Sequence, residues 1–182
     1  MIGGSAGSVN VLLKIMSGLS ADLSFPIVIV LHRKSGHDSL LGDILSVRTT
    51  LRVKEIEEKE FLQPATIYLA PPAYHTLIEK DGSFSLDASE KVNFSRPAID
   101  VTFESAAEVY ERELFALLLS GANSDGTLGL EYILKKKGMA AVQDPSTAIV
   151  SFMPQHALEH AEVPLQLKPS EMAEFINNLS NL

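Results

Sequence analysis

Short apolar runs alternate with amphipathic stretches along this chain of 182 residues. Four of these runs, residues 26–31, 66–70, 114–119 and 139–142, are of strand length and rich in aliphatic side chains. Continuous runs of this kind are typical of strands that are buried on both faces of a parallel sheet. The pattern therefore predicts a buried, mainly parallel sheet.

The stretches between the runs place apolar residues at spacings of three and four, which predicts helices with one buried face. Each predicted helix starts at a residue that suits a helix N-terminus or at the edge of an apolar pattern. The predicted helices are residues 9–19, residues 40–45 after a cap at Asp38, residues 97–110, and a last helix after Pro169-Ser170.

Residues 75–86 break this alternation. Two short runs flank Asp81-Gly82, a dipeptide that favours a tight hairpin turn. The predicted fold class is therefore α/β, with a doubly wound, mostly parallel sheet and an antiparallel hairpin appended to it.

Composition excludes several classes of function. The formal charge of −8 leaves no basic face of the kind that a nucleic acid requires. The absence of cysteine excludes disulfides, thiolate metal sites and cysteine nucleophiles. No apolar run is long enough to cross a bilayer and the first residues lack the features of a signal peptide, so we expect a cytoplasmic protein without membrane insertion.

Three reactive side chains follow the carboxyl ends of three predicted strands, where open α/β sheets bind their ligands. Ser5 lies in a glycine-rich turn before the first helix, His32 directly follows the second strand, and Asp125 lies in the loop after residues 114–119. Because these ends meet at one edge of a parallel sheet, the fold can assemble a Ser-His-Asp triad from them.

The turn around Ser5 matches the Gly-x-Ser-x-Gly pattern of a nucleophile elbow, with Gly3 and Gly7 as its small residues. The helix that follows offers free N–H groups and a positive dipole end to a developing oxyanion. The order serine, histidine, aspartate differs from that of α/β-hydrolases, so another class of serine enzyme is indicated. The same turn also suits a phosphate- or nucleotide-binding module, although it lacks the Lys-Ser/Thr end of a P-loop.

Other histidines compete with His32 as the base. His75 lies near a strand end and is the main rival. His156 and His160 lie four apart on a predicted helix, where a solvated face is the plain interpretation and a metal site would need a third ligand. His37 falls on a loop or near a helix start.

Asp125 also has an ordinary interpretation, as a helix cap or turn residue beside Gly126. Asp100 and Asp144 are alternative acids. Asp100 falls in the first turn of the predicted helix at 97–110, where a carboxylate suits the helix dipole without any catalytic role.

Six motifs along the chain occur in the order found in one known family. They are residues 2–7 (IGGSAG), the strand ending in His32, residues 68–75 (YLAPPAYH), 94–101 (FSRPAIDV), 119–126 (LSGANSDG) and 143–148 (QDPSTA). Together they resemble the catalytic domain of bacterial chemotaxis methylesterases over essentially the whole chain.

The resemblance implies a three-layer α/β fold and a serine esterase that needs no metal or cofactor. Its substrates would be glutamate 5-methyl esters on the cytoplasmic helices of chemoreceptors, with methanol as a product, and the same site often deamidates glutamine in this family. By position, the family's nucleophile, base and acid fall on Ser5, His32 and Asp125. The backbone N–H groups near Ala6 and Ala122 are expected to bind the oxyanion.

The chain departs from many chemotaxis members near the nucleophile and before the aspartate. Ala6 stands where a hydroxyl residue is frequent, Gly7-Ser8 replaces two glycines, and Gly121-Ala122-Asn123 replaces Gly-Met-Gly. This version resembles the stand-alone branch of the family, whose members are often found beside or fused to sensory or regulatory modules. We expect residues 1–182 to form one methylesterase catalytic domain with a truncated first strand and no receiver domain, which would need about a hundred further residues.

Residues 33–54 contain five Lys or Arg against two Asp. Receptor methylation helices are rich in glutamate, so this stretch predicts a positive rim for docking them, with a solvated surface as the alternative. A non-catalytic signalling domain of the same fold is the remaining alternative for the whole chain.

Overall fold

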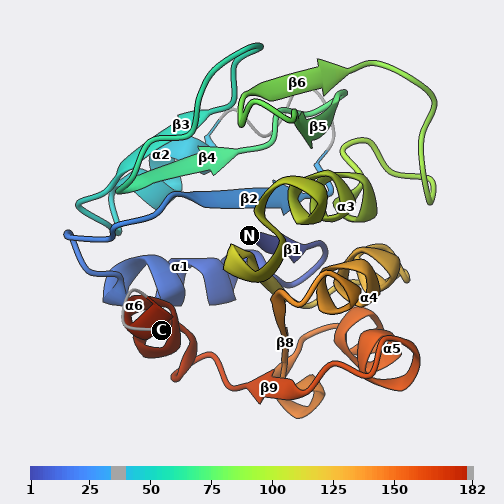
Figure 1. The fold of residues 1–182 in the computed structure, drawn as a ribbon. Helices are drawn as coiled ribbons and strands as arrows, with labels where there is room; N and C mark the ends of the chain where they lie inside the picture. The colour runs from blue at the N-terminus through green and yellow to red at the C-terminus, as the bar shows by residue number, and fades with distance from the viewer. Residues whose placement is uncertain (34–39, 180–182) are drawn as a thin grey trace.

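The computed structural model describes residues 1–33 and 40–179. In these residues seven parallel strands form one sheet in the order β3-β4-β2-β1-β7-β8-β9 (Figure 1). The strands are β1 (Ile2–Gly4), β2 (Ile27–Leu31), β3 (Arg52–Glu55), β4 (Thr66–Leu69), β7 (Phe115–Leu118), β8 (Met139–Gln143) and β9 (Leu165–Leu167).

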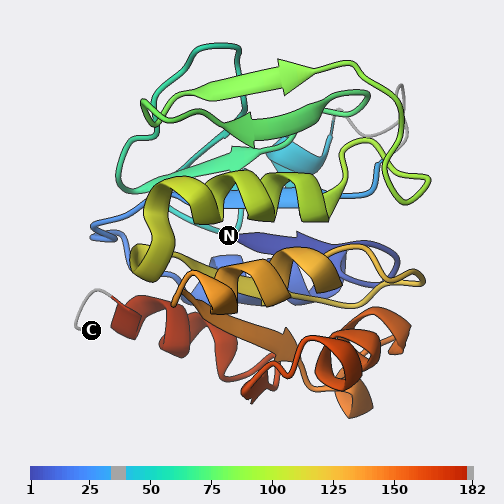
Figure 2. The same ribbon diagram turned by 45° about the vertical axis from the view of Figure 1, so that its right-hand side comes forward.

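Helices cover both faces of this sheet (Figures 1 and 2). One face carries α1 (Val9–Gly18), α2 (Leu41–Ser46) and α6 (Met172–Asn178). The other carries α3 (Ile99–Tyr110), α4 (Thr127–Lys135) and α5 (Phe152–His160). Two short 3-10 turns, Glu111–Glu113 and Pro145–Thr147, complete the helical elements. The predicted three-layer, doubly wound α/β fold is therefore confirmed.

The two cores follow from the alternation of side chains along each strand. In β2, Val28 and Val30 pack in the core under α3, α4 and α5, whereas Ile27, Ile29 and Leu31 pack in the core under α1, α2 and α6. Because both faces are covered, all five residues are buried. This is why the strand appears in the sequence as an unbroken apolar run.

The predicted hairpin is confirmed as a separate antiparallel pair, β5 (His75–Ile78) and β6 (Phe84–Asp87). Gly82 has a positive φ of 83°, as the tight turn requires. The pair packs on the α3 side of the main sheet and leads through residues 88–98 into α3 (Figure 2).

The apolar pattern located most elements but not all of them. It gave no strand at β3, whose residues Arg-Val-Lys-Glu lie at the sheet edge and are largely exposed, and it also missed β9 and α4. The helix expected from Pro97 begins at Ile99, and the expected cap at Asp38 lies outside the described residues. No described helix is long and apolar enough to span a membrane.

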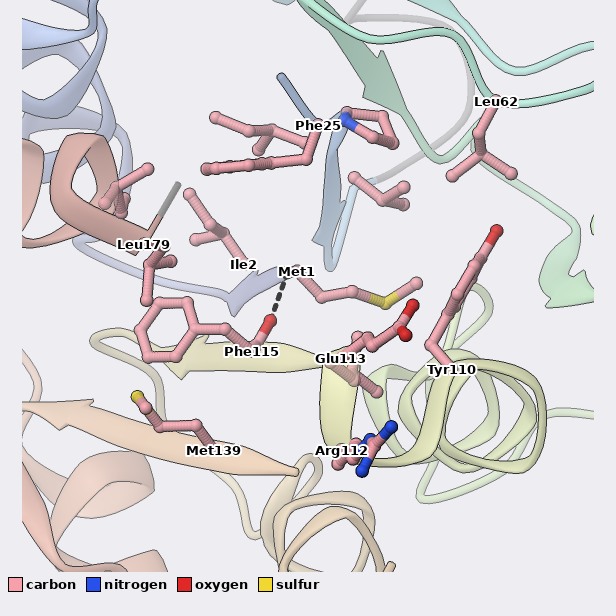
Figure 3. A pocket seen from close by; sticks show the side chains of 15 residues that line it. Met1, Ile2, Phe25, Leu62, Tyr110, Arg112, Glu113, Phe115, Met139 and Leu179 are labelled. Atoms are coloured by element: carbon pink, nitrogen blue, oxygen red, sulfur yellow. Dashed lines mark hydrogen bonds between the residues drawn. The ribbon is translucent and has the colours of Figure 1, made fainter. Parts of the chain in front are cut away.

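A cavity of about 560 Å³ opens at the amino ends of the strands (Figure 3). Its lining includes Met1, Ile27, Phe115 and Met139, which begin or precede four of the strands. Met1 is held there by a hydrogen bond from its terminal nitrogen to the carbonyl oxygen of Phe115 at 2.6 Å. Ser5, His32 and Asp125 follow the opposite ends of the strands, so the cavity is separate from them.

Candidate active site

Strand pairing places Ser5 beside His32. In the β1–β2 register Gly4 lies opposite Leu31, so the next residue of each strand leaves the sheet at the same edge. The His32 N–H donates to the Gly4 carbonyl at 3.2 Å, and the Ser5 N–H donates to the Ser120 carbonyl at 2.9 Å. Ser5 is thus fixed between the ends of β2 and β7, at the centre of the sheet.

The turn after Ser5 depends on Gly7, which has a φ of 85°. A Cβ at this position would lie 2.7 Å from both Ile149 Cβ and Ser120 Oγ. Ser8 closes the turn, because its N–H and its hydroxyl both donate to the Ser5 carbonyl, at 3.2 Å and 2.6 Å. The Ser8 N–H is therefore already paired with Ser5, which weakens the interpretation of this turn as a phosphate cradle.

The loop after β7 is tied to the Ser5 turn through buried polar groups. Gln143 accepts the Ser120 N–H at 3.1 Å and donates to the Thr147 carbonyl at 3.1 Å. The Ser120 hydroxyl lies 2.7 Å from the Ala6 carbonyl oxygen. A Cβ at Gly121 would lie 3.1 Å from Ser5 Cβ, so this loop packs directly on the serine.

His32 and Asp125 are joined by a hydrogen bond of 2.7 Å between Nε2 and Oδ2. Asp125 is fully buried, while 13% of the His32 side chain is exposed. An ionised carboxylate only accepts, so the proton of the neutral imidazole lies on Nε2. The nitrogen that remains to act as a base is therefore Nδ1.

Two buried aspartates cap each other's helices. The Asp125 carboxylate accepts the Ile99 N–H at 2.7 Å and the Asp100 N–H at 3.0 Å, at the N-terminus of α3. The Asp100 carboxylate accepts the Gly126 and Gly129 N–H groups, both at 2.8 Å, at the N-terminus of α4. The predicted role of Asp125 as a helix cap is therefore observed, although it caps α3 rather than the helix beside it.

The carboxyl groups of Asp100 and Asp125 lie in one buried site, so each affects the pKa of the other. Burial, and then the charge of Asp125, raise the pKa of Asp100 to about 7, although the Gly129 and Gly126 N–H groups oppose the shift. Burial alone would also raise the pKa of Asp125, but hydrogen bonds from His32, Asp100 and Ile99 hold that pKa below its ordinary value. Asp125 is therefore the ionised member and Asp100 the protonated one below neutral pH.

His75, the main rival of His32, is buried and engaged through both ring nitrogens. Nδ1 accepts the Ala98 N–H at 3.2 Å, and Nε2 lies 2.9 Å from the Glu90 carbonyl oxygen. Neither nitrogen is available to Ser5, and the ring instead ties together the two ends of the segment before α3.

The other candidates lie apart from the His32–Asp125 pair. Asp144 caps the Pro145–Thr147 turn, and hydrogen bonds from the Ser146 hydroxyl at 2.7 Å and then from the Ser146 N–H at 2.9 Å lower its pKa. The rings of His156 and His160 stack on α5 with centroids 4.0 Å apart, and His156 Nδ1 lies 3.0 Å from Thr127 Oγ1. His37 lies outside the described residues.

Known proteins match both this sequence and this fold. The profile of the CheB methylesterase family matches residues 1–176. The chain belongs to the CheB methylesterase family. A relative from Leptospira interrogans is 45% identical over 179 residues, which cover 98% of this chain and 93% of that protein.

Relatives from Thermotoga maritima extend the comparison to a solved structure. The protein-glutamate methylesterase/protein-glutamine glutaminase of that organism is 32% identical over 183 residues, and the match covers 97% of this chain but only 53% of the relative. The crystal structure of the Thermotoga maritima CheB methylesterase catalytic domain superposes with a TM-score of 0.94 at 32% identity, covering 98% of this chain and 96% of that one. The family and fold expected from the six motifs are thereby confirmed.

Two of the positions at which the chain departs from many members of the CheB methylesterase family are Ala6 and Ala122. In the described residues no protein acceptor pairs with the N–H of Ala6 or of Ala122. Both N–H groups lie next to residues that pack on the nucleophile turn, so the loss of a hydroxyl or methionine side chain leaves the backbone donors in place.

The basic residues of the stretch at 33–54 do not all lie at the same edge of the sheet. Arg33 follows His32 at the carboxyl edge and donates to Glu55 at 2.9 Å and to the Ala70 carbonyl at 2.7 Å. Arg52 begins β3 at the opposite, amino edge of the sheet, and residues 34–39 lie outside the described residues. Because only 5% of the Arg33 side chain is exposed and it is paired with Glu55, it gives the predicted positive rim no support, and the rim stays a prediction.

The sequence analysis did not identify the residues that position Asp125 and the loop beside Ser5. Asn93 donates to Asp100 Oδ2 at 2.8 Å and lies 3.4 Å from Asp125 Oδ1. Gln143 and Ser120 fix the loop that packs on Ser5. Asn93 lies beside the motif at 94–101, and Ser120 and Gln143 lie within those at 119–126 and 143–148, whose presence was the available signal.

Proposed function

We propose that this chain is a serine esterase that hydrolyses glutamate 5-methyl esters on the cytoplasmic helices of chemoreceptors. The observation that carries the proposal is the 2.7 Å contact between His32 and Asp125, formed at the strand ends that also hold Ser5. The relatives named protein-glutamate methylesterase/protein-glutamine glutaminase give the substrate class. Residues 1–182 would correspond to the catalytic domain, since the match covers 96% of the Thermotoga domain.

The first half of the reaction is acylation of Ser5. His32 Nδ1 takes the hydroxyl proton as Ser5 Oγ attacks the ester carbonyl, and the N–H groups of Ala6 and Ala122 receive the oxyanion. The imidazolium that forms is stabilised by Asp125, whose own position is fixed by two N–H groups of α3. The imidazolium then protonates the leaving oxygen, and methanol departs.

The second half returns the enzyme to its starting state. His32 Nδ1 takes a proton from water, the resulting hydroxide attacks the acyl-Ser5 carbonyl, and the glutamate side chain leaves as Ser5 regains its proton. A glutamine side chain forms the same acyl-enzyme with ammonia as the leaving group, so we extend the proposal to deamidation. Every step uses groups of this chain and water.

The first test is methanol release from a methylated chemoreceptor fragment by the wild-type protein and by Ser5→Ala. We expect release that falls by several orders of magnitude in the variant, because the triad acts as a unit. A fluorophosphonate should label Ser5 in the wild type. Labelling without methanol release would leave the triad in place and refute the substrate, whereas failure of both would refute the enzyme.

A further inference from the structure

An exposed aromatic side chain stands beside the buried pair of aspartates. Phe94 lies in the segment between β6 and α3, and its side chain is 97% exposed. The preceding residue, Asn93, donates to Asp100 at 2.8 Å and lies 3.4 Å from Asp125. The backbone of Phe94 is therefore one residue away from direct contact with the triad carboxylate.

Phe94 occupies a backbone conformation that suits it poorly. Val92 and Ser95 exchange backbone hydrogen bonds of 3.2 Å and 2.9 Å, which closes a two-residue turn. Both central residues have positive φ, 49° at Asn93 and 61° at Phe94. Turns of this kind favour Asn-Gly, so asparagine fits the first position, but a bulky side chain at the second is an outlier. Strained positions of this kind cluster at binding and catalytic sites.

The segment that carries Phe94 is anchored on both sides of the turn. His75 holds Glu90 and Ala98 through its two ring nitrogens. The Arg96 guanidinium donates to the carbonyl oxygens of Ala88 and Ser89. These contacts fix the turn at the end of the molecule where the loops after β1 and β7 also lie (Figure 2).

Other exposed apolar side chains lie around the same loops, and together with Phe94 they form what we call the apolar rim. Ile149 is 70% exposed and faces Gly7 of the nucleophile turn. Phe152 is 51% exposed and precedes Met153, whose N–H donates to the Gly121 carbonyl. The apolar rim is thus built on the elements that hold Ser5 and Asp125. Exposed apolar side chains that gather around one site are typical of an interaction surface.

We infer that Phe94, presented by the Val92–Ser95 turn, is a docking residue for the helical surface of the protein substrate. The inference rests on the proposed function. A macromolecular ester can reach Ser5 only if its surface covers the edge of the sheet around the triad, where the apolar rim lies. The net formal charge of −8 gives a glutamate-rich helix no overall electrostatic attraction to this chain, so we assign apolar contacts a share of the affinity.

The test compares a protein substrate with a small one. Phe94→Ala and Phe94→Gly should each lower kcat/KM for a methylated receptor fragment roughly tenfold relative to kcat/KM for p-nitrophenyl acetate, mainly through KM. Phe94→Gly matters because glycine adopts a φ of 61° without strain, so this variant loses the ring while the turn keeps its conformation. Phe61→Ala is the matched control, because Phe61 is 55% exposed but lies beside Leu62 at the amino-end cavity.

The outcomes separate this inference from the function on which it rests. A receptor-fragment KM that stays at the wild-type value in both Phe94 variants would overturn the inference while Ser5-dependent methanol release still supported the function. An equal loss on both substrates would also overturn it, because it would mean that the turn acts on the triad rather than on docking. Wild-type protein that releases no methanol would refute the function and the inference together.

Discussion

Asp100, in the first turn of α3, and Asp125, just before α4, exchange helix caps: the Asp125 carboxylate accepts two N–H groups at the N-terminus of α3, and the Asp100 carboxylate accepts two at the N-terminus of α4. The arrangement holds α3 and α4 together at the edge where His32 meets Asp125. It gives the Asp125 carboxylate a fixed position and a positive environment at the N-terminus of α3. A change at either aspartate should therefore affect both turnover and the free energy of unfolding.

Replacement of Asp125 should separate its two roles. Asp125→Ala leaves the Ile99 and Asp100 N–H groups buried without an acceptor, which should lower the free energy of unfolding by about 2–4 kcal/mol. Asp125→Asn keeps one carbonyl oxygen and should cost less stability, yet turnover should still fall by roughly 10³–10⁴, because the amide cannot hold the His32 tautomer as a carboxylate does. Urea titrations and small-ester kinetics measure the two effects, and wild-type turnover in Asp125→Asn would contradict the triad.

Asp100 should make the protein less stable as the pH rises. Its pKa is raised from 3.8 to about 7 in the folded state, so the folded protein holds a proton that the unfolded chain releases between these values. The free energy of unfolding should therefore fall from about pH 4 through pH 7, by roughly a few kcal/mol. The lowered pKa of Asp125 acts in the opposite sense, with stability lost only as the pH falls below about 4.

The control for this pH dependence is Asp100→Asn, whose carbonyl oxygen can still accept the Gly126 and Gly129 N–H groups. Urea titrations between pH 5 and pH 8 should show a decline in the wild type that is largely absent in the variant. The other titrating groups are common to both proteins, so they cancel in the difference. Parallel pH profiles would show that Asp100 does not titrate in this range.

The edge of the sheet at which Ser5 and His32 lie could be predicted because chain direction alone determines it. In a parallel sheet the residue after each strand lies at one edge, so Ser5 and His32 could be brought together from the apolar runs alone. The polar edge strand β3 could not be seen in this way, because an exposed strand needs no apolar run. The reciprocal caps and the contact from Asn93 were also out of reach, since they join residues 25 to 32 positions apart whose spacing carries no periodic signal.

The two histidines near strand ends should respond to mutation in opposite ways. His75→Leu removes the acceptor of the buried Ala98 N–H and should lower the free energy of unfolding by about 1–3 kcal/mol, with small-ester turnover largely kept. His32→Gln should lower turnover by several orders of magnitude, because it removes the base. Small-ester kinetics and urea titrations of both variants distinguish the two roles. Loss of turnover in the His75 variant, with turnover kept in the His32 variant, would show that the base is misassigned.

Gly7 should be required both for folding and for the reactivity of Ser5. Alanine at this position must adopt a φ of 85°, and its Cβ would press on Ile149 and Ser120 at 2.7 Å. We expect Gly7→Ala to lower the free energy of unfolding by about 2 kcal/mol or more and to slow labelling of Ser5 by a fluorophosphonate, because the turn that Ser8 closes on Ser5 must shift.

Gly42→Ala is the matched control. Gly42 lies in α2, where an added Cβ would meet only Leu69 at 3.7 Å. This variant should raise the free energy of unfolding by roughly 0.5–1 kcal/mol without affecting labelling. Equal behaviour of the two variants would show that the backbone at Gly7 does not set the position of the nucleophile.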